Sequence, residues 1–252
     1  VSGSFDDCQD LVKMAFADEN INTERLLTSA NSINVARWLP QQIYYLLALK
    51  QWQQNHSEKP VISVPSGNFG NICAGILSYF RGLPVEHFVA GCNENDVVPH
   101  YLKTQKFEIK KTVATLSNAM DVGNPSNFVR ILELFQHQFK DMQDAISGYA
   151  IDDEKTLRTI SDVHQKFNYI LEPHGAVAYA ALKKFMHENP GNKGLILETA
   201  HPVKFPEAVE KATKCKVHLP ATLNDLIKKE RNYKSVEIQP DFEELKRFLL
   251  TH

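Results

Sequence analysis

Short apolar runs rich in β-branched residues alternate with segments of helical periodicity over most of the chain. The runs that predict strands are Val61–Val64, His87–Ala90, Tyr149–Ile151, Tyr169–Leu171 and Leu195–Thr199. The segments that predict helices are Asn71–Phe80, Phe128–Phe139, Glu154–Phe167, Gly175–His187, Pro206–Ala212 and Phe242–Leu250. This order favours the α/β class, with an open, mostly parallel twisted sheet and helices on both faces. Residues 91–127 fit the alternation less well and are interpreted as an insertion.

The N-terminal part of the chain is also predicted to be helical. Apolar residues recur at helical spacing over Asp7–Phe16 and again over Ile33–Trp52, a segment that contains Pro40. Because proline lacks an N–H group, either a helix begins at Pro40 or a longer helix kinks there. The polar stretch Gln53–Lys59 is the best candidate for a linker. We therefore predict one domain over residues 1–55 and a second over residues 56–252.

Composition and charge exclude several classes of protein. The chain has 252 residues, of which 43% are hydrophobic and 23% charged, as in an ordinary globular protein. A formal net charge of -2 predicts neither a nucleic acid nor a membrane as partner, and the apolar runs are too short to span a bilayer. Four scattered cysteines form no C-x-x-C pair, which predicts reduced thiols and a cytoplasmic location. The first residue is Val1, and we interpret the chain as a fragment, incomplete at its N-terminus.

A glycine-rich loop, Ser66–Asn71, connects the predicted strand Val61–Val64 to a predicted helix. Backbone N–H groups in such a loop point toward the positive end of the helix dipole, where a phosphate dianion binds well. The loop has neither the Lys-Ser/Thr of a Walker A motif nor G-x-G-x-x-G spacing. It therefore indicates a small phosphorylated cofactor or substrate, and not ATP or NAD. The alternative is a tight turn in which the glycines serve backbone geometry alone.

Three polar loops follow predicted strands: Ser66–Asn71, Glu172–Gly175 and Thr199–Pro202. In an open parallel sheet, ligands bind outside the carboxyl ends of the strands, so we expect all three loops at one edge. His174 and His201 lie in two of them, and neither has a partner at metal-ligand spacing. Structural or gating roles are therefore favoured for both over a general base or a metal ligand.

A second candidate phosphate site lies in the segment from Asn31 to Arg37. If the segment is helical, Asn31, Asn34 and Arg37 share one face. A guanidinium with two amides and a hydroxyl suits phosphate, because arginine offers a planar fork of donors. The alternative is a helix cap followed by a surface arginine.

Taken together, these segments resemble threonine synthase, a pyridoxal-phosphate (PLP) enzyme of fold type II whose fold is like that of the tryptophan synthase β subunit. The matching stretches are Phe5–Gln9, Ser29–Arg37, Val64–Gly70, Thr115–Asp121, Glu172–Ala176 and Thr199–Pro202. The Gly-Asn-x-Gly loop by itself indicates only a fold type II PLP enzyme. The Ser-Asn-Ala-Met-Asp and Thr-Ala-His-Pro stretches narrow the resemblance to threonine synthase. By this resemblance, residues 1–55 are the end of an N-terminal region and residues 56–252 are the PLP-phosphate-binding domain.

The resemblance implies a cofactor, a substrate and a role for each motif. The PLP phosphate would be bound by five residues of the glycine loop: Gly67, Asn68, Phe69, Gly70 and Asn71. The pyridine nitrogen of PLP would contact the hydroxyl of Thr199. The phosphate of the substrate would be held by Asn31, Ser32, Asn34 and Arg37. The implied reaction converts the small molecule O-phospho-L-homoserine and water to L-threonine and phosphate, the last step of threonine biosynthesis, and makes the enzyme a carbon–oxygen lyase. No metal is implied, and the oligomeric state stays open.

One departure from the family concerns the Schiff-base lysine. In the family it belongs to a Phe-Lys-Asp motif upstream of the region that this chain matches. Phe139-Lys140-Asp141 has the same letters, but we interpret Lys140 as a solvated surface residue of a helix. We therefore expect this chain to contain no catalytic lysine and to be inactive alone. The alternatives are another fold type II PLP enzyme and a non-catalytic module that binds PLP or phosphate.

Overall fold

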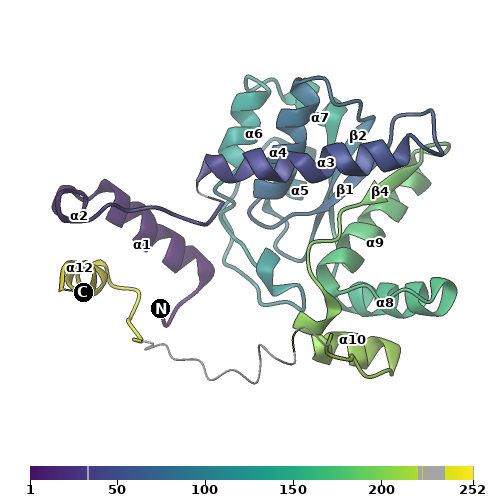
Figure 1. The fold of residues 1–252 in the computed structure, drawn as a ribbon. Coiled ribbons are helices and arrows are strands. Elements are labelled where there is room, and N and C mark those ends of the chain that lie inside the picture. Colours follow the sequence, from purple (N-terminus) through teal and green to yellow (C-terminus); the bar gives the residue numbers. More distant parts are fainter. Residues whose placement is uncertain (33, 221–222, 224–235, 252) are drawn as a thin grey trace. The chain divides into compact units, whose positions relative to one another are not determined.

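The computed structural model describes residues 1–32, 34–220, 223 and 236–251. These residues form two compact units, one made of Val1–Ala30 with Leu219–His252 and the other of Asn31–His218 (Figure 1). Ile33, at the start of a predicted helix, lies outside the described residues. The domain boundary predicted after residue 55 lies within the larger unit, and these two units do not test it, so it stays a prediction.

The larger unit contains a parallel sheet with the strand order β3-β2-β1-β4. Its strands are β1 Val61–Pro65, β2 His87–Cys92, β3 Ile146–Ala150 and β4 Gly194–Ile196. Its α-helices are α3 Trp38–Trp52, α4 Gly70–Phe80, α5 Val97–Thr104, α6 Phe128–Leu134, α7 Phe139–Ala145, α8 Asp153–Phe167, α9 Pro173–Glu188 and α10 Pro206–Thr213. Short 3-10 helices occur at Val35–Arg37, Asn118–Met120 and Pro202–Lys204. The predicted α/β fold with a parallel sheet is confirmed.

Both faces of the sheet are covered by helices, because side chains alternate along each strand and both sets are apolar. Ile62, Val64 and Phe88 belong to a core shared with α3, α4, α5, α6 and α7. Val61 and Val89 belong to a second core, on the side of α9. Helices α8 and α10 pack outside α9 (Figure 1). Because all four strands are parallel, their carboxyl ends lie at one edge of the sheet.

Two predicted elements are wrong. Tyr169–Leu171 is not a strand but part of the connection between α8 and α9. Helix α8 ends at Phe167, its C-cap Asn168 lies in the left-handed region with φ 52°, and Glu172 caps α9. The three residues between these two caps connect the helices and pair with no strand of the sheet. The helix predicted over Phe128–Phe139 ends at Leu134, and α7 begins anew at Phe139, because Gln136 and His137 also have positive φ. Apolar spacing alone does not report such left-handed residues.

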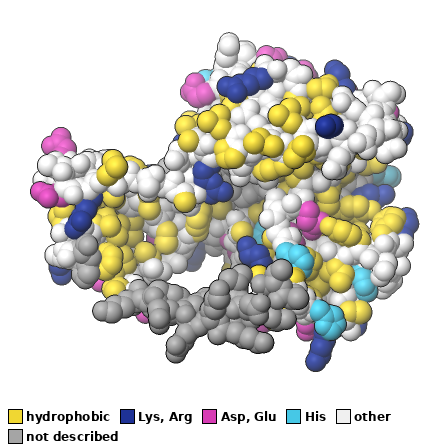
Figure 2. Space-filling view, in the orientation of Figure 1, with side chains coloured by type: hydrophobic (Ala, Val, Ile, Leu, Met, Phe, Trp, Pro, Cys, Tyr) yellow, Lys and Arg dark blue, Asp and Glu magenta, His cyan; other side chains and the backbone are white. Residues whose placement is uncertain are grey.

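Helix α3 begins at Trp38, so Pro40 lies in its first turn and not at its first residue. The N–H groups of a first turn have no partner within the helix, which explains why Pro40 is tolerated without a kink. Four apolar side chains of α3 are exposed: Leu39, Ile43, Leu46 and Leu47. Figure 2 shows hydrophobic side chains gathered over this helix.

In the described part of the smaller unit, the helices are α1 Phe5–Ala17, α2 Glu19–Glu24 and α12 Phe242–Thr251. Ser4 and Asp7 form a capping box at the start of α1. Lys246 of α12 pairs with Asp18 at 2.7 Å, so the two ends of the chain meet within this unit. Among the described residues, no helix is long and apolar enough to cross a membrane.

Candidate functional site

The loop after β1 has the geometry of an anion site. The N–H of Ser66 donates to the carbonyl of Gly91 at 2.8 Å, which fixes the start of the loop to the neighbouring strand. Phe69 has left-handed backbone angles (φ 62°), and α4 begins directly after it at Gly70. The N–H groups of Gly67, Phe69 and Gly70 have no hydrogen-bond acceptor among the residues that the structure describes. They are therefore available to a ligand at the N-terminus of α4.

Two glycines of this loop are required by close packing. A Cβ on Gly67 would overlap the backbone of Met120. A Cβ on Gly70 would lie 2.7 Å from the Cβ of Ser32, closer than carbon atoms approach without a shift. The loop is thus supported from two sides by segments distant in sequence, so its backbone donors are held in place before a ligand binds.

The side chain of Asn68 connects the loop to both neighbouring segments. Its Nδ2 donates to Ser32 Oγ at 2.8 Å. Its Oδ1 accepts hydrogen bonds from the backbone N–H and the hydroxyl of Ser126, at 2.7 and 2.9 Å. Predicted as a cofactor contact, Asn68 acts in this structure as a brace for the loop.

Asn71 is also anchored through its side chain. Its Oδ1 accepts hydrogen bonds from the hydroxyls of Tyr44 and Tyr45, at 2.6 and 2.8 Å. These bonds fix the first turn of α4 to α3, so that a contact of Asn71 with a phosphate would come from its backbone N–H or its Nδ2. Burial raises the pKa of Tyr44 to about 12, and the nearby charge of Arg37 opposes this shift.

The Asn31–Arg37 segment is not one continuous helix. Asn34 caps the 3-10 helix Val35–Arg37, its Oδ1 accepting from the N–H of Ala36 at 3.0 Å. Asn31 lies before this helix, where its Oδ1 accepts from the N–H and hydroxyl of Ser32. Ser32 is placed against the glycine loop, and Arg37 is exposed. The structure therefore brings one member of the predicted substrate site into contact with the predicted cofactor site.

Asn127 and Arg130 also border the glycine loop, although our sequence analysis did not single them out. Arg130 Nη1 donates to the carbonyl of Ser32 at 3.0 Å and to Asn127 Oδ1 at 2.7 Å. Asn127 is fully buried, and its Nδ2 finds no acceptor in the described part of the chain. That Nδ2 lies 3.5 Å from where a Cβ on Gly70 would be. A buried amide with an unpaired donor beside a loop of free N–H groups suits an anionic ligand. Its sequence signal was the Ser-Asn pair before a predicted helix.

The loops Glu172–Gly175 and Thr199–Pro202 come together at the N-terminus of α9. Glu172 is completely buried and caps α9, accepting from the N–H groups of His174 and Gly175 at 2.9 and 2.7 Å. A Cβ on Gly175 would overlap the carboxylate of Glu198, which directly precedes Thr199. Burial raises the pKa of Glu198, and the nearby charge of Glu172 adds to this effect. Thr199 itself is exposed in the loop after β4.

The 3-10 turn Asn118–Met120 contacts both His174 and the glycine loop. His174 Nε2 accepts from the N–H of Ala119 at 3.2 Å, and the next residue, Met120, packs against Gly67. The expected gathering of the loops at one edge of the sheet is thus seen, although Glu172–Gly175 does not follow a strand. His201 caps the 3-10 helix Pro202–Lys204 through its Nδ1, a structural role.

Lys140 is far from being a buried attachment point. Its side chain is 78% exposed and pairs with Asp144 one turn later in α7. No three His, Cys, Asp or Glu side chains gather as metal ligands in the described residues.

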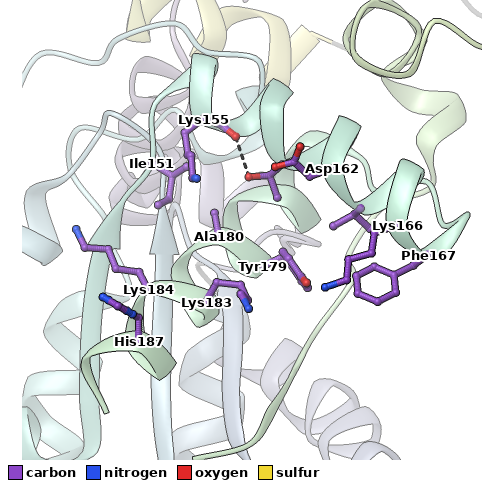
Figure 3. Close-up of a pocket in the computed structure, with 12 residues that line it drawn as sticks. Ile151, Lys155, Asp162, Lys166, Phe167, Tyr179, Ala180, Lys183, Lys184 and His187 are labelled. Atoms are coloured by element: carbon purple, nitrogen blue, oxygen red, sulfur yellow. Dashed lines mark hydrogen bonds between the residues drawn. The ribbon is translucent and has the colours of Figure 1, made fainter. Parts of the chain in front are cut away.

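A groove of about 630 Å³ between α8 and α9 is lined by residues that include Lys155, Lys166, Lys183 and Lys184 (Figure 3). None of its lining residues belongs to the glycine loop or to the loops around Glu172 and Thr199. Volume alone therefore does not identify the candidate site. The backbone donors of the glycine loop and the buried amide of Asn127 identify it instead.

Comparison with known proteins agrees with the motifs. Residues 1–197 match the family described as "Pyridoxal-phosphate dependent enzyme", and residues 175–249 match "Threonine synthase, C-terminal". Threonine synthase of Escherichia coli is 43% identical over the whole chain, and that of Buchnera aphidicola from Acyrthosiphon pisum is 44% identical over 99% of it. The chain spans 58% and 57% of these two relatives.

Solved structures give the same result. The crystal structure of Escherichia coli threonine synthase matches with a TM-score of 0.92 and 42% identity, covering 100% of this chain and 57% of that protein. The PLP-bound threonine synthase of Brucella melitensis matches with a TM-score of 0.81 and 29% identity, over 99% of this chain and 58% of that protein.

Proposed function

This chain belongs to the pyridoxal-phosphate-dependent enzyme family, and from that premise we propose that it carries the two phosphate sites of a threonine synthase. The reaction would convert O-phospho-L-homoserine and water to L-threonine and phosphate. One observation carries the proposal. The loop after β1 presents backbone N–H groups at a helix N-terminus, next to a buried amide whose Nδ2 finds no acceptor among the described residues.

The residues present fit the phosphate of PLP. Backbone N–H groups of Gly67, Phe69, Gly70 and Asn71 would donate to it, and Asn127 would supply a side-chain donor. No side chain fills the space at Gly67 or Gly70 without displacing its neighbour. The exposed hydroxyl of Thr199 is proposed to meet the pyridine nitrogen. When bound, PLP supplies an electron sink that makes protons next to the amino group of a substrate easier to remove.

The substrate's phosphate is assigned to Asn31, Ser32, Asn34 and Arg37. Arg37 is exposed and brings a fork of charged donors, which suits a phosphate dianion. Ser32 lies between the two sites, since its hydroxyl accepts from Asn68 of the glycine loop. The chain would therefore hold cofactor and substrate phosphates next to each other, and that proximity would orient the substrate's reacting carbons toward the cofactor.

The alternative functions make different products or none. Another fold type II PLP enzyme would share the glycine loop but act on other substrates, and a non-catalytic module would bind PLP or phosphate without turnover. The complete reading frame that contains this sequence should release phosphate from O-phospho-L-homoserine and form L-threonine in equal amounts. Binding of PLP with no phosphate release would contradict the proposal, and so would turnover of unphosphorylated amino acids alone.

A further inference from the structure

We propose that the Glu172–His174 pair positions the Asn118–Met120 turn and, through it, the glycine loop. His174 would be a positioning residue and not a catalytic one. The inference rests on the proposed function only in naming the glycine loop as the PLP-phosphate site. Its structural part concerns hydrogen bonds and packing within this chain.

The first step concerns the protonation of His174. His174 is 3% exposed, and Glu172 beside it is fully buried. The N–H of Ala119 can only donate, so His174 Nε2, 3.2 Å away, must be the acceptor and carry no proton. The proton of a neutral imidazole then lies on Nδ1, which is 2.6 Å from Glu172 Oε2 and donates to it. Glu172 thereby selects the tautomer that Ala119 needs.

The second step leads from Ala119 to the glycine loop. Ala119 lies in the middle of the 3-10 helix Asn118–Met120. The N–H of Met120 donates to the carbonyl of Ser117 at 2.9 Å, and the N–H of Asp121 donates to the carbonyl of Asn118 at 3.1 Å, so two successive backbone hydrogen bonds close this turn. Met120 is buried, and its backbone occupies the space that a Cβ on Gly67 would need. A shift of the turn by a few tenths of an ångström is therefore transmitted to the backbone of Gly67, since close-packed atoms cannot absorb it.

The third step shows that His174 holds the turn from one side only. On the other side, Asp121 Oδ1 accepts from Thr115 Oγ1 at 2.7 Å and from Asn93 Nδ2 at 2.8 Å. The ring of Phe205 lies 4.8 Å from the imidazole and restricts its movement. Removing the acceptor at His174 would release the side of the turn that faces α9 and leave the anchor at Asp121 intact.

The test compares two substitutions that each keep one half of the imidazole's hydrogen bonding. In His174→Asn the amide nitrogen can still donate to Glu172, but no acceptor reaches Ala119. In His174→Gln the longer side chain can present its oxygen to the Ala119 N–H. His201→Asn, at the exposed histidine of the neighbouring loop, is the matched control.

Three measurements decide the proposal. Nitrogen-15 spectra of the unsubstituted chain should show an unprotonated His174 Nε2; a protonated Nε2 would overturn it. In His174→Asn the Ala119 amide resonance should move and its hydrogen exchange should accelerate at least ~10-fold, the expected result of losing one protecting hydrogen bond. His174→Gln should recover part of this change and His201→Asn should show none. An Ala119 amide unchanged in His174→Asn would also overturn the proposal.

Titration with PLP tests the link to the glycine loop. The affinity should fall about tenfold in His174→Asn, the order of one weakened ligand hydrogen bond. Equal affinity in the presence of a displaced Ala119 amide would overturn this link. Failure of the unsubstituted chain to bind PLP would count against the proposed function instead, because the amide measurements need no ligand.

Discussion

The two candidate phosphate sites are built in different ways. The glycine loop, residues 66–71, offers backbone N–H groups and is packed against Met120 and Ser32. The Asn31–Arg37 segment offers side chains instead, and its one charged group, Arg37, is exposed. The first site therefore depends on backbone donors held in place by packing, whereas the second depends on donors at the ends of side chains.

This difference matches the two proposed ligands. A cofactor stays bound through many turnovers, so a preorganised cradle loses little entropy on binding it. A substrate must enter and its phosphate must leave, and a proposed site made of side chains can change its contacts one side chain at a time. The difference also determines which substitutions can weaken each site. Backbone donors cannot be removed by substitution, so the glycine loop must be displaced, whereas the guanidinium of Arg37 can be removed by truncating its side chain.

The largest effect is expected from Gly67→Ala. The added Cβ would overlap the backbone of Met120, which cannot move aside as the end of a flexible side chain can. The loop must shift, and we expect PLP affinity to fall at least ~100-fold together with a loss of about 1–3 kcal/mol in the free energy of unfolding. Titration with PLP and thermal denaturation measure the two effects.

The matched control is Gly148→Ala. Its Cβ would lie 3.0 Å from Pro99 Cα, in a tight contact between β3 and α5 that involves no residue of the glycine loop. It should lower the melting temperature while leaving PLP affinity unchanged. Equal PLP affinity in Gly67→Ala and the unsubstituted protein would show that the loop is an ordinary turn.

The next effect is expected from Arg37→Ala in the complete reading frame. If Arg37 holds the substrate phosphate through the reaction, kcat/KM should fall at least ~100-fold, which corresponds to about 2.7 kcal/mol. Arg37→Lys should recover only part, because a point charge does not reproduce the fork. PLP affinity should survive both changes. Loss of PLP with normal melting in Arg37→Ala would mean that the two phosphate sites have been assigned the wrong way round.

A smaller effect is expected on the pH dependence of stability, through Tyr44, which donates to Asn71 of the glycine loop and senses the charge of Arg37. Burial raises the pKa of Tyr44 from 10.0 to about 12, and Arg37 opposes the rise. A phenol whose pKa is higher in the folded state favours folding fully below pH 10, its unfolded value, and this contribution is lost as the pH rises toward 12. Tyr44→Phe should therefore weaken the decline of stability between these pH values.

Arg37→Ala should move the Tyr44 titration to still higher pH, because the opposing charge is gone. Ultraviolet absorbance of the phenolate during alkaline titration measures this. A Tyr44 that titrates at the same pH in both proteins would indicate that the Arg37 guanidinium does not lie near the first turn of α4.

The sequence predicts the glycine loop well because its determinants are local. An apolar strand, a glycine turn and an amphipathic helix are adjacent in the chain, and the structure has β1, the loop and α4 there. The contacts of Ser32, Asn127 and Arg130 could not be predicted, because they join segments that only the folded sheet brings together. The false strand at Tyr169–Leu171 has a related cause. Leu171 is apolar because it packs against Ile160, Val163 and Ala176 in the connection before α9, not because it pairs with a strand.

The smallest effect is expected from Lys140→Gln, which tests whether the cofactor binds at the glycine loop or on α7. Lys140 stands in a Phe-Lys-Asp sequence, but its side chain is 78% exposed and pairs with its helical neighbour Asp144. A surface pair of this type is worth about 0.5 kcal/mol or less. Melting temperature and PLP affinity should both stay unchanged. Borohydride reduction of the 252-residue chain mixed with PLP should leave no stoichiometric label on Lys140. Stoichiometric labelling there would place the cofactor on α7, away from the glycine loop. The glycine loop would then not be the PLP-phosphate site, and its contrast with the Asn31–Arg37 segment would no longer be one between cofactor and substrate.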